Sequence, residues 1–200
     1  ARVSGAGALG FVTGSGVNHV EGGQVGLELV AARAQFQHVS GAGVGVKGSG
    51  TLGGDSLDSA NLVEGNGVGV KDFSGTIQYS RIAGNGIGIE ATTGQQIHHS
   101  LIYGNTTAGL LVSGKSGIGV YQNTFHATTG DNLRLQAGAQ NVEVIGNIFW
   151  AEAGYDLYVA NDSQAGFYSD YNDLHASGTG KVGYWTKDFT DVLDWQADIA

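Results

Sequence analysis

Aromatic side chains are concentrated in the second half of the chain, which holds 14 of the 18 Phe, Tyr and Trp residues. An aromatic ring can stack on the apolar face of a sugar, and a nearby carboxylate can accept hydrogen bonds from its hydroxyl groups. We therefore expect a glycan-binding surface in that half, unless these rings fill wider interior layers or cover the end of the fold. The candidate glycan-binding residues are Tyr155, Asp156, Tyr158, Tyr168, Tyr171 and Trp185.

Histidines are the first candidates for a metal site, because the chain contains no cysteine. His19 and His38 occupy equivalent positions in the repeat described below, so a metal ion could bridge them. The next equivalent residue is Leu62, which leaves such a site without a third ligand. His98 and His99 are adjacent, and neighbours on a strand point to opposite faces. We expect no metal site and no cofactor. Calcium binding is left open, although no calcium-binding motif supports it.

Composition narrows the classes of function. The 200 residues include 36 glycines and no proline, and 9 Lys and Arg against 18 Asp and Glu give a net charge of -9. Scattered cations in an acidic chain argue against a nucleic-acid partner. The apolar content of 41% predicts a folded domain, and no apolar run is long enough to span a membrane. No signal peptide begins the sequence, so any secretion signal lies outside it or has been removed. We expect a secreted or cell-surface protein.

A repeat of 19 to 25 residues runs through the whole chain. Short runs with apolar residues at alternate positions recur with successive spacings of 19, 24, 19, 23, 23, 24 and 25 residues. A period in this range is typical of a solenoid, in which each unit buries its apolar side chains by stacking on its neighbours. The runs begin at Val25, Val44, Val68, Ile87, Leu110, Leu133, Leu157 and Val182.

A second register places a small polar residue before each run and a mostly apolar residue two positions later. This alternation indicates strands, with both members of each pair pointing inward. Buried polar side chains at equivalent positions can form a hydrogen-bonded ladder along the stack. A partial third register consists of Asn66, Asn85 and Asn105. The predicted ladder residues are Asn18, Gln37, Asn61, Ser80, Ser100, Asn123, Asn147 and Asp170.

The pattern predicts an all-β parallel β-helix of about eight coils. The alternative, a Greek-key protein, gives no reason for polar residues at a constant period. Alternation within the runs predicts an outward strip of bare backbone at Gly26, Gly45, Gly69 and Gly88, which could pack against a chain segment, a glycan or protein surface, or a second copy of the chain. On the same strands, charged residues one coil apart are expected to pair, as in Glu28 with Lys47 and Lys71 with Glu90.

Several segments carry a resemblance to a known family: RIAGNGIGI, VIGNIFWAEAGYDLYV, and FYSDYNDLHASGTGKVGYW followed by LDWQA. Nearly all of residues 10–200 resembles bacterial proteins of the right-handed parallel β-helix, pectate-lyase-like superfamily. The resemblance implies a single right-handed domain over residues 1–200, as a fragment of a longer protein. Residues 186–200 then form a short helical or irregular C-terminal cap, with Thr190 as the N-cap.

The same resemblance implies what an enzyme of this fold would need. Its polysaccharide lyases use Arg or Lys as a base and acidic residues that hold calcium. The residues of those types are Arg81, Lys115, Arg134 and Asp131, but the sequence does not bring them into one cluster, and we assign no catalytic residue.

We therefore expect a non-catalytic, structural or ligand-presenting module that binds a glycan or a protein surface. The alternative is a lyase, epimerase or glycosidase acting on an acidic polysaccharide.

Overall fold

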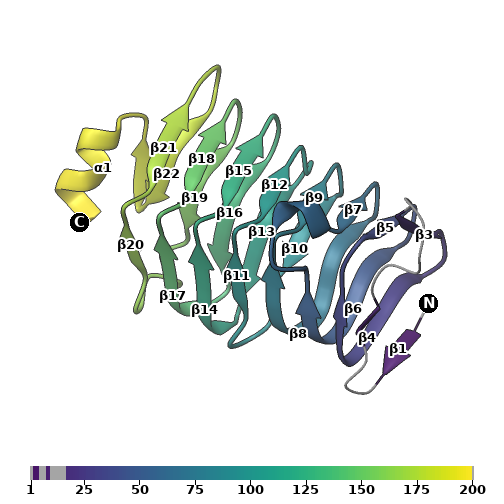
Figure 1. The fold of residues 1–200 in the computed structure, drawn as a ribbon. Coiled ribbons are helices and arrows are strands. Elements are labelled where there is room, and N and C mark those ends of the chain that lie inside the picture. The colour runs from purple at the N-terminus through teal and green to yellow at the C-terminus, as the bar shows by residue number, and fades with distance from the viewer. Residues whose placement is uncertain (1, 5–7, 10–16, 200) are drawn as a thin grey trace.

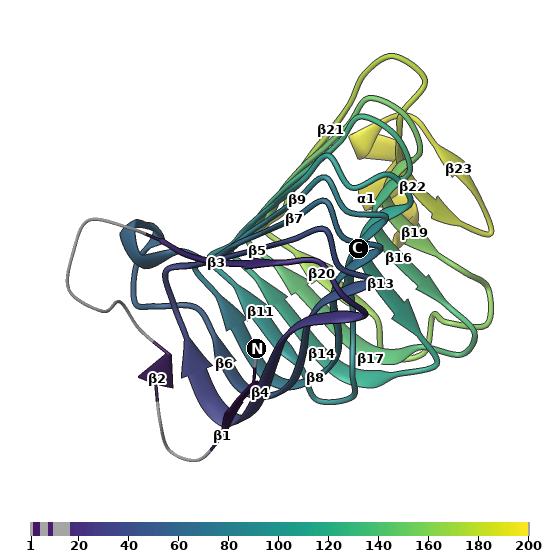
Figure 2. The same ribbon diagram turned by 90° about the vertical axis from the view of Figure 1, so that its right-hand side faces the viewer.

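The chain folds into a parallel β-solenoid, described here from a computed structural model that covers residues 2–4, 8–9 and 17–199 (Figure 1). The strands lie on three faces, so that the stack has a three-sided outline when viewed close to its axis (Figure 2). This confirms the prediction of an all-β parallel solenoid. One face carries eight strands from successive coils, and seven complete turns therefore separate its first strand from its last.

The first face is an eight-stranded parallel sheet. Each strand is short because a turn follows after three or four residues. Its strands are β3 (Asn18–Glu21), β5 (Gln37–Ser40), β7 (Leu62–Glu64), β9 (Arg81–Ala83), β12 (Leu101–Tyr103), β15 (Thr124–Ala127), β18 (Ile148–Ala151) and β21 (Asp173–Ala176).

The other two faces belong to one 15-stranded sheet, because three long strands bend from one face to the other. These are β4 (Val25–Ala34), β6 (Val44–Leu52) and β8 (Val68–Gln78), and β8 pairs with the first strands of both later series. The second face continues with β10 (Ile87–Glu90), β13 (Ala108–Ser113), β16 (Asp131–Gln136), β19 (Tyr155–Val159) and β22 (Lys181–Trp185). The third continues with β11 (Gln96–His98), β14 (Ser116–Tyr121), β17 (Gln140–Ile145) and β20 (Tyr168–Asp170).

Terminal elements complete the stack. β1 (Arg2–Ser4) and β2 (Ala8–Leu9) pair with β4, and a 3-10 turn (Leu57–Ser59) lies between β6 and β7. β23 (Lys187–Phe189) runs antiparallel to β22 and leads into α1 (Val192–Ile199). Of the residues that the structure describes, none belongs to a helix long and apolar enough to cross a membrane.

The C-terminal helix covers the last coil. Trp195 is buried, with its ring edge-on to Phe189, and a Cβ atom on Gly183 would lie 2.2 Å from the Trp195 ring. Glycine at that position thus lets the indole cover the end of the core. Asp191, not Thr190, caps the helix, because its Oδ1 accepts a hydrogen bond from the Leu193 N–H at 2.7 Å.

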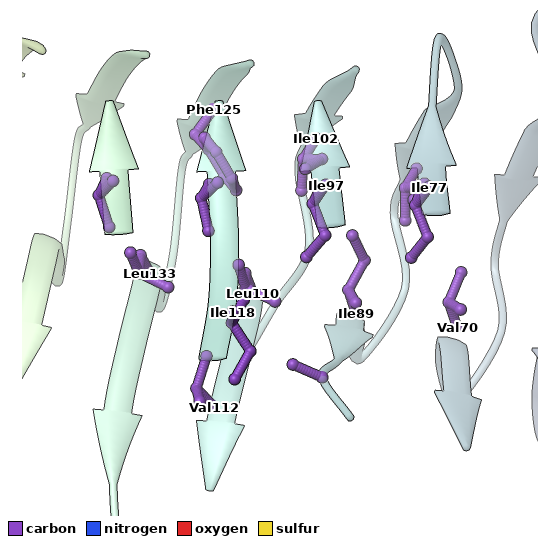
Figure 3. Packing of buried hydrophobic residues seen from close by; sticks show 14 of the residues in the cluster. Val70, Ile77, Ile89, Ile97, Ile102, Leu110, Val112, Ile118, Phe125 and Leu133 are labelled. Atoms are coloured by element: carbon purple, nitrogen blue, oxygen red, sulfur yellow. The ribbon is translucent and has the colours of Figure 1, made fainter. Parts of the chain in front are cut away.

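The core consists of stacked apolar rows from all three faces. Figure 3 shows neighbouring coils contributing equivalent residues, such as Val70 and Ile89 from one face and Ile77 and Ile97 from another. Phe125 stacks on Phe149 with 4.8 Å between ring centroids. Repetition of one coil therefore buries a continuous core without long-range sequence segments having to pair.

A polar ladder runs along the eight-stranded sheet. Each coil contributes one residue to it, which is either the first residue of the strand or the residue just before that strand. Asn123 donates from its Nδ2 to Asn147 Oδ1 at 3.0 Å, and Asn147 donates in the same way to Asn172. Each amide oxygen also accepts the backbone N–H of the preceding coil. The buried residues Gln37, Asn61, Ser80, Ser100, Asn123 and Asn147 agree with the predicted ladder, and Asn18 pairs in register with Gln37.

The last ladder position is Asn172 and not Asp170. Asp173 pairs with Ile148, which aligns Asn172 with Asn147, while Asp170 pairs with Ile145 at the end of β20. The predicted position was wrong by two residues because the final coil is longer. The inward apolar residue of that coil is accordingly Leu174, which pairs with Phe149.

The glycine strip lies inside the solenoid, contrary to the sequence prediction. In the first four coils the apolar run begins two residues earlier than in the later coils, since Leu110, which starts the fifth run, pairs with Ile89 and not with Ile87. Gly26, Gly45, Gly69 and Gly88 are buried, and a Cβ atom on Gly69 would lie 2.5 Å from Gly88 O and 2.9 Å from Asn85 Nδ2. The outward row is instead Glu28, Lys47, Lys71, Glu90, Leu111, Arg134, Tyr158 and Tyr184.

These glycines therefore cannot dock a second chain, because the Val39 side chain occupies the space beside Gly26, and inward amides occupy the space beside the other three. These amides are those of Asn66, Asn85 and Asn105. The predicted charge pairs on the outward row are present, with Lys47 Nζ 3.5 Å from Glu28 Oε1 and Lys71 Nζ 3.0 Å from Glu90 Oε2.

Candidate functional site

The outer surface of the eight-stranded sheet, here called the ring face, carries two rows of outward side chains, and several of these are aromatic or imidazole rings. Alternation along each short strand places one outward residue on each side of the inward one. The first row is His19, His38, Leu62, Arg81, Leu101, Thr124, Ile148 and Asp173, and the second is Glu21, Ser40, Glu64, Ala83, Tyr103, His126, Trp150 and His175.

The second row carries a series of rings along the axis of the stack. The His126 and Trp150 ring centroids are 5.1 Å apart, and those of Trp150 and His175 are 5.4 Å apart. Tyr103 is 41% exposed and Trp150 45%, and Ile148 beside them is 51% exposed. Trp150 Nε1 donates to Ser177 Oγ at 3.0 Å, which holds in place an indole that is nearly half exposed. The row is thus a rigid apolar platform in contact with water.

Two hollows of the ring face share Arg81. A hollow of about 370 Å³ is lined by Arg81, Leu101, Tyr103, Thr124 and His126. A second, of about 430 Å³, lies towards the N-terminal coils, where its lining includes His19, His38, Phe36 and Leu57 as well as Arg81. No acidic side chain of the described residues forms an ion pair with Arg81, unlike Arg33 and Arg134. Arg81 is therefore available to an anionic group of a ligand.

Histidines meet in pairs at two places. His19 Nδ1 lies 3.0 Å from His38 Nδ1, and His38 Nε2 lies 2.8 Å from Glu64 Oε1. His98 and His99 also meet, with 2.9 Å between their Nδ1 atoms, because His99 has a left-handed backbone with φ of 53°. The expectation that adjacent histidines stay apart was wrong for this reason. Burial, and then the neighbouring His99, lowers the pKa of His98.

The predicted glycan residues near β19 form a different kind of cluster. Tyr158 stacks on Tyr184 at 4.7 Å between centroids, and the Arg134 guanidinium lies 3.8 Å from the centre of the Tyr158 ring. Tyr155 OH donates to Asp188 Oδ1 at 2.8 Å. Burial and this hydrogen bond raise the pKa of Tyr155. The Tyr155 hydroxyl and the Arg134 guanidinium of this cluster are thus engaged within the protein.

Two of the six predicted glycan residues point elsewhere. Asp156 is fully buried and accepts a hydrogen bond from Asn132 Nδ2 at 2.9 Å, so it cannot contact a surface ligand. Trp185 is half-buried and packs against Phe167 and the core. Tyr168 and Tyr171 are 52% and 83% exposed, but they lie at β20 and the turn after it. The six residues therefore do not form one surface.

The candidate catalytic residues are also dispersed. Arg134 Nη1 lies 2.7 Å from Asp131 Oδ2, but Arg81 is on the ring face and Lys115 follows β13. Asp131 Oδ1 accepts the Tyr155 N–H at 3.1 Å, and burial raises the pKa of Asp131. Within the described ranges, no three His, Asp or Glu side chains gather in a metal-binding group.

Sequence reasoning missed the second row of the ring face. Alternation around the inward residues Ile102, Phe125 and Phe149 could have identified it, because the residues that follow them are Tyr103, His126 and Trp150. The first row, which precedes the inward residue of each strand, includes aliphatic residues such as Leu62, Leu101 and Ile148 that suggest no chemistry.

Comparison with known proteins gives one result about ancestry. No curated protein and no solved structure matches the sequence significantly. The family described as right handed beta helix region matches residues 15–191, which is more than half of the chain. With parallel strands stacked in three faces along this same range, the chain belongs to the right-handed β-helix family.

Proposed function

We propose that this chain is a non-catalytic, ligand-presenting β-helix module of a secreted or cell-surface protein, and that it binds a glycan along the ring face. The observation that carries the proposal is the exposed pair Tyr103 and Trp150 on either side of His126, next to a hollow of about 370 Å³. A flat sheet that leaves two large rings in water has the form of a stacking platform for sugars.

The spacing of the platform suits an extended chain of sugars. Tyr103 and Trp150 are two strands apart in register, which corresponds to about 10 Å along the axis. A linear glycan lying along the stack could therefore place successive apolar sugar faces on both rings. Arg81, on the neighbouring row, favours a glycan that carries carboxylate groups.

The mutual engagement of two of the other charged candidates, Arg134 and Asp131, supports binding rather than turnover. Arg134 and Asp131 pair with each other on the second face, where Arg134 also bonds Gln136 Oε1 at 2.8 Å. A base held by an ion pair and covered by the Tyr158 ring is poorly placed to accept a proton from a substrate.

The proposal is tested by titrating neutral and uronate-containing oligosaccharides into the protein by calorimetry, with and without calcium. Trp150→Ala and Tyr103→Ala should each weaken binding at least tenfold, which corresponds to about 1.4 kcal/mol. Tyr171→Ala is the matched control, because Tyr171 is an exposed tyrosine in the turn before β21, outside both rows of the ring face, and its loss should leave affinity unchanged.

Equal affinity of the Trp150 variant and the Tyr171 variant would contradict the proposal. Ultraviolet absorbance of an unsaturated product, or release of reducing ends, would replace it with an enzyme acting on an acidic polysaccharide.

A further inference from the structure

Three side chains from neighbouring strands meet at the N-terminal end of the ring face. His19 comes from β3, His38 from β5 and Glu64 from β7. His38 is the central member, since its Nδ1 faces His19 Nδ1 at 3.0 Å and its Nε2 faces Glu64 Oε1 at 2.8 Å. The glycan-binding proposal assigns no role to this arrangement.

The carboxylate fixes which nitrogen of His38 carries the proton. An ionised Glu64 can only accept a hydrogen bond, so His38 Nε2 must donate to it. The neutral His38 ring then has an unprotonated Nδ1, which accepts a hydrogen bond from His19 Nδ1–H. A metal ion between the two nitrogens would take the place of that proton, with the neutral His19 ring carrying its proton on Nε2 instead. A histidine whose one nitrogen donates to a carboxylate while the other presents a lone pair is the usual state of a metal-ligating histidine.

We propose that His19 and His38 bind a divalent transition-metal ion through their Nδ1 atoms, with Glu64 as the positioning residue behind His38. Two nitrogens that are each 2.0–2.1 Å from a metal lie about 2.9 Å apart at a right angle and about 3.3 Å apart at a tetrahedral angle. The observed 3.0 Å falls between these values. An N–metal–N angle close to a right angle suits the square-planar geometry of copper(II), which is also the most tightly bound ion of the first-row series.

The remaining coordination positions fall to water or to a ligand. The two histidines line a hollow of about 430 Å³ that also contains Asp58 and Arg81. The site differs from a closed structural metal site in having two protein ligands instead of four, so its metal stays open to exchange. It therefore forms an open metal centre on the surface of the solenoid.

Two other places in the molecule each contain half of the arrangement and serve as controls. His126 Nε2 lies 2.9 Å from Glu152 Oε1, but the adjacent ring is that of Trp150. His98 and His99 bring two imidazoles together, and the ring stacked on His99 is that of Tyr79. If pairing and carboxylate support are both needed, neither place should bind the first equivalent of metal.

The test is a titration of the chain with copper(II), followed by electron paramagnetic resonance and by competition with a chelator. The first equivalent should show coupling to two nitrogens. It should be lost in His19→Ala and in His38→Ala, and retained in His126→Ala and in the double variant His98→Ala/His99→Ala. Glu64→Gln should keep the two-nitrogen signal but weaken affinity roughly 10- to 100-fold, as loss of a carboxylate behind a ligating histidine does.

The histidine side chains tested at this site lie on the outer surface, so circular dichroism and thermal unfolding should show folded variants. Survival of the first equivalent in both His19→Ala and His38→Ala would overturn the proposal. Its loss in the His98/His99 double variant would do the same, and unchanged affinity in Glu64→Gln would remove Glu64 from the site.

Discussion

The two halves of the solenoid fill the same interior position by opposite means. In the first five coils this position is a glycine, and in the next two it is Asn132 and Asp156, with Val182 following. Beside Gly45, Gly69 and Gly88 the space is occupied by an asparagine from the turn that leads into the next coil, as Asn85 does beside Gly69. Where the strand contributes Asn132, that side chain bonds Asp156 of the next coil itself.

A buried amide is thus retained in both halves, although it comes from a different place in the chain. Asn66, Asn85 and Asn105 form a second ladder, in which the Nδ2 of each of the first two donates to the Oδ1 of the next at 3.0 Å. Further along, Asn132 Nδ2 donates to Asp156 Oδ1. The first solution satisfies every amide, whereas Asp156 Oδ2 has no hydrogen-bond partner among the described residues. At this interior position the first solution is therefore the better satisfied of the two.

Gly69→Ala should break the first solution and have the largest effect. The new Cβ atom would meet Gly88 O at 2.5 Å and Asn85 Nδ2 at 2.9 Å, and backbone on an adjacent strand cannot yield without disturbing the ladder. We expect a loss of about 3 kcal/mol in the free energy of unfolding, measured by urea denaturation.

Gly84→Ala is the matched control, because Gly84 has a φ of 60° and no atom within 4 Å of its added Cβ. Its cost should be about 1 kcal/mol, from the left-handed backbone alone. Gly69 itself does not have a left-handed backbone, so equal losses in the two variants would mean that lack of space at Gly69 adds nothing to the cost of the change.

Asn132→Gly should show whether the second half depends on its own side chains. The change removes the donor to buried Asp156 and adds backbone freedom to a strand, for a combined loss of about 2 kcal/mol. In the double variant Asn132→Gly/Asp156→Gly the buried carboxyl is absent as well, so the loss should be smaller than the sum of the two single losses. Additive losses in urea denaturation would show that the two residues do not interact.

The sequence was sufficient to predict the repeat and most of the ladder, because ladder residues such as Asn123 and Asn147 recur at a nearly constant spacing. It failed at Asp170, where the last coil lengthens. A left-handed residue precedes several ladder positions, as Phe36, Tyr79 and Gln122 do, and Tyr171 precedes Asn172 in the same way. That backbone regularity is a property of the folded turn, which residue types alone do not reveal.

The errors about surfaces have a second physical cause. Alternation with period two holds along a straight strand but not through the corner before it, where both Gly69 and Val70 are buried. Because the period of two was applied through that corner, the glycine row was wrongly predicted to point outward. The His38 and Glu64 contact was missed because it is diagonal between neighbouring strands, and the equivalent residue directly beside His38 is Leu62.

Asp156→Asn should have the smallest effect, because it replaces a buried ionisable carboxyl of the second half with a neutral amide. Burial raises the pKa of Asp156 to about 8, although hydrogen bonds from Asn132 and from the backbone of His175 oppose the shift. The carboxyl therefore binds its proton more tightly in the folded state than in the unfolded chain, where its pKa is about 4. Its contribution to stability is complete below pH 4 and is lost as the pH rises through 8.

The free energy of unfolding of the wild-type chain should accordingly fall by about 1 kcal/mol between pH 7 and pH 8 relative to the Asp156→Asn variant. All other titrating groups are common to the two chains, so the difference between their urea denaturation curves isolates Asp156. The amide keeps an oxygen for Asn132 and cannot ionise, which is why the variant should become the more stable chain as the pH increases. Parallel pH profiles for the two chains would show that the carboxyl of Asp156 does not change its protonation over this range.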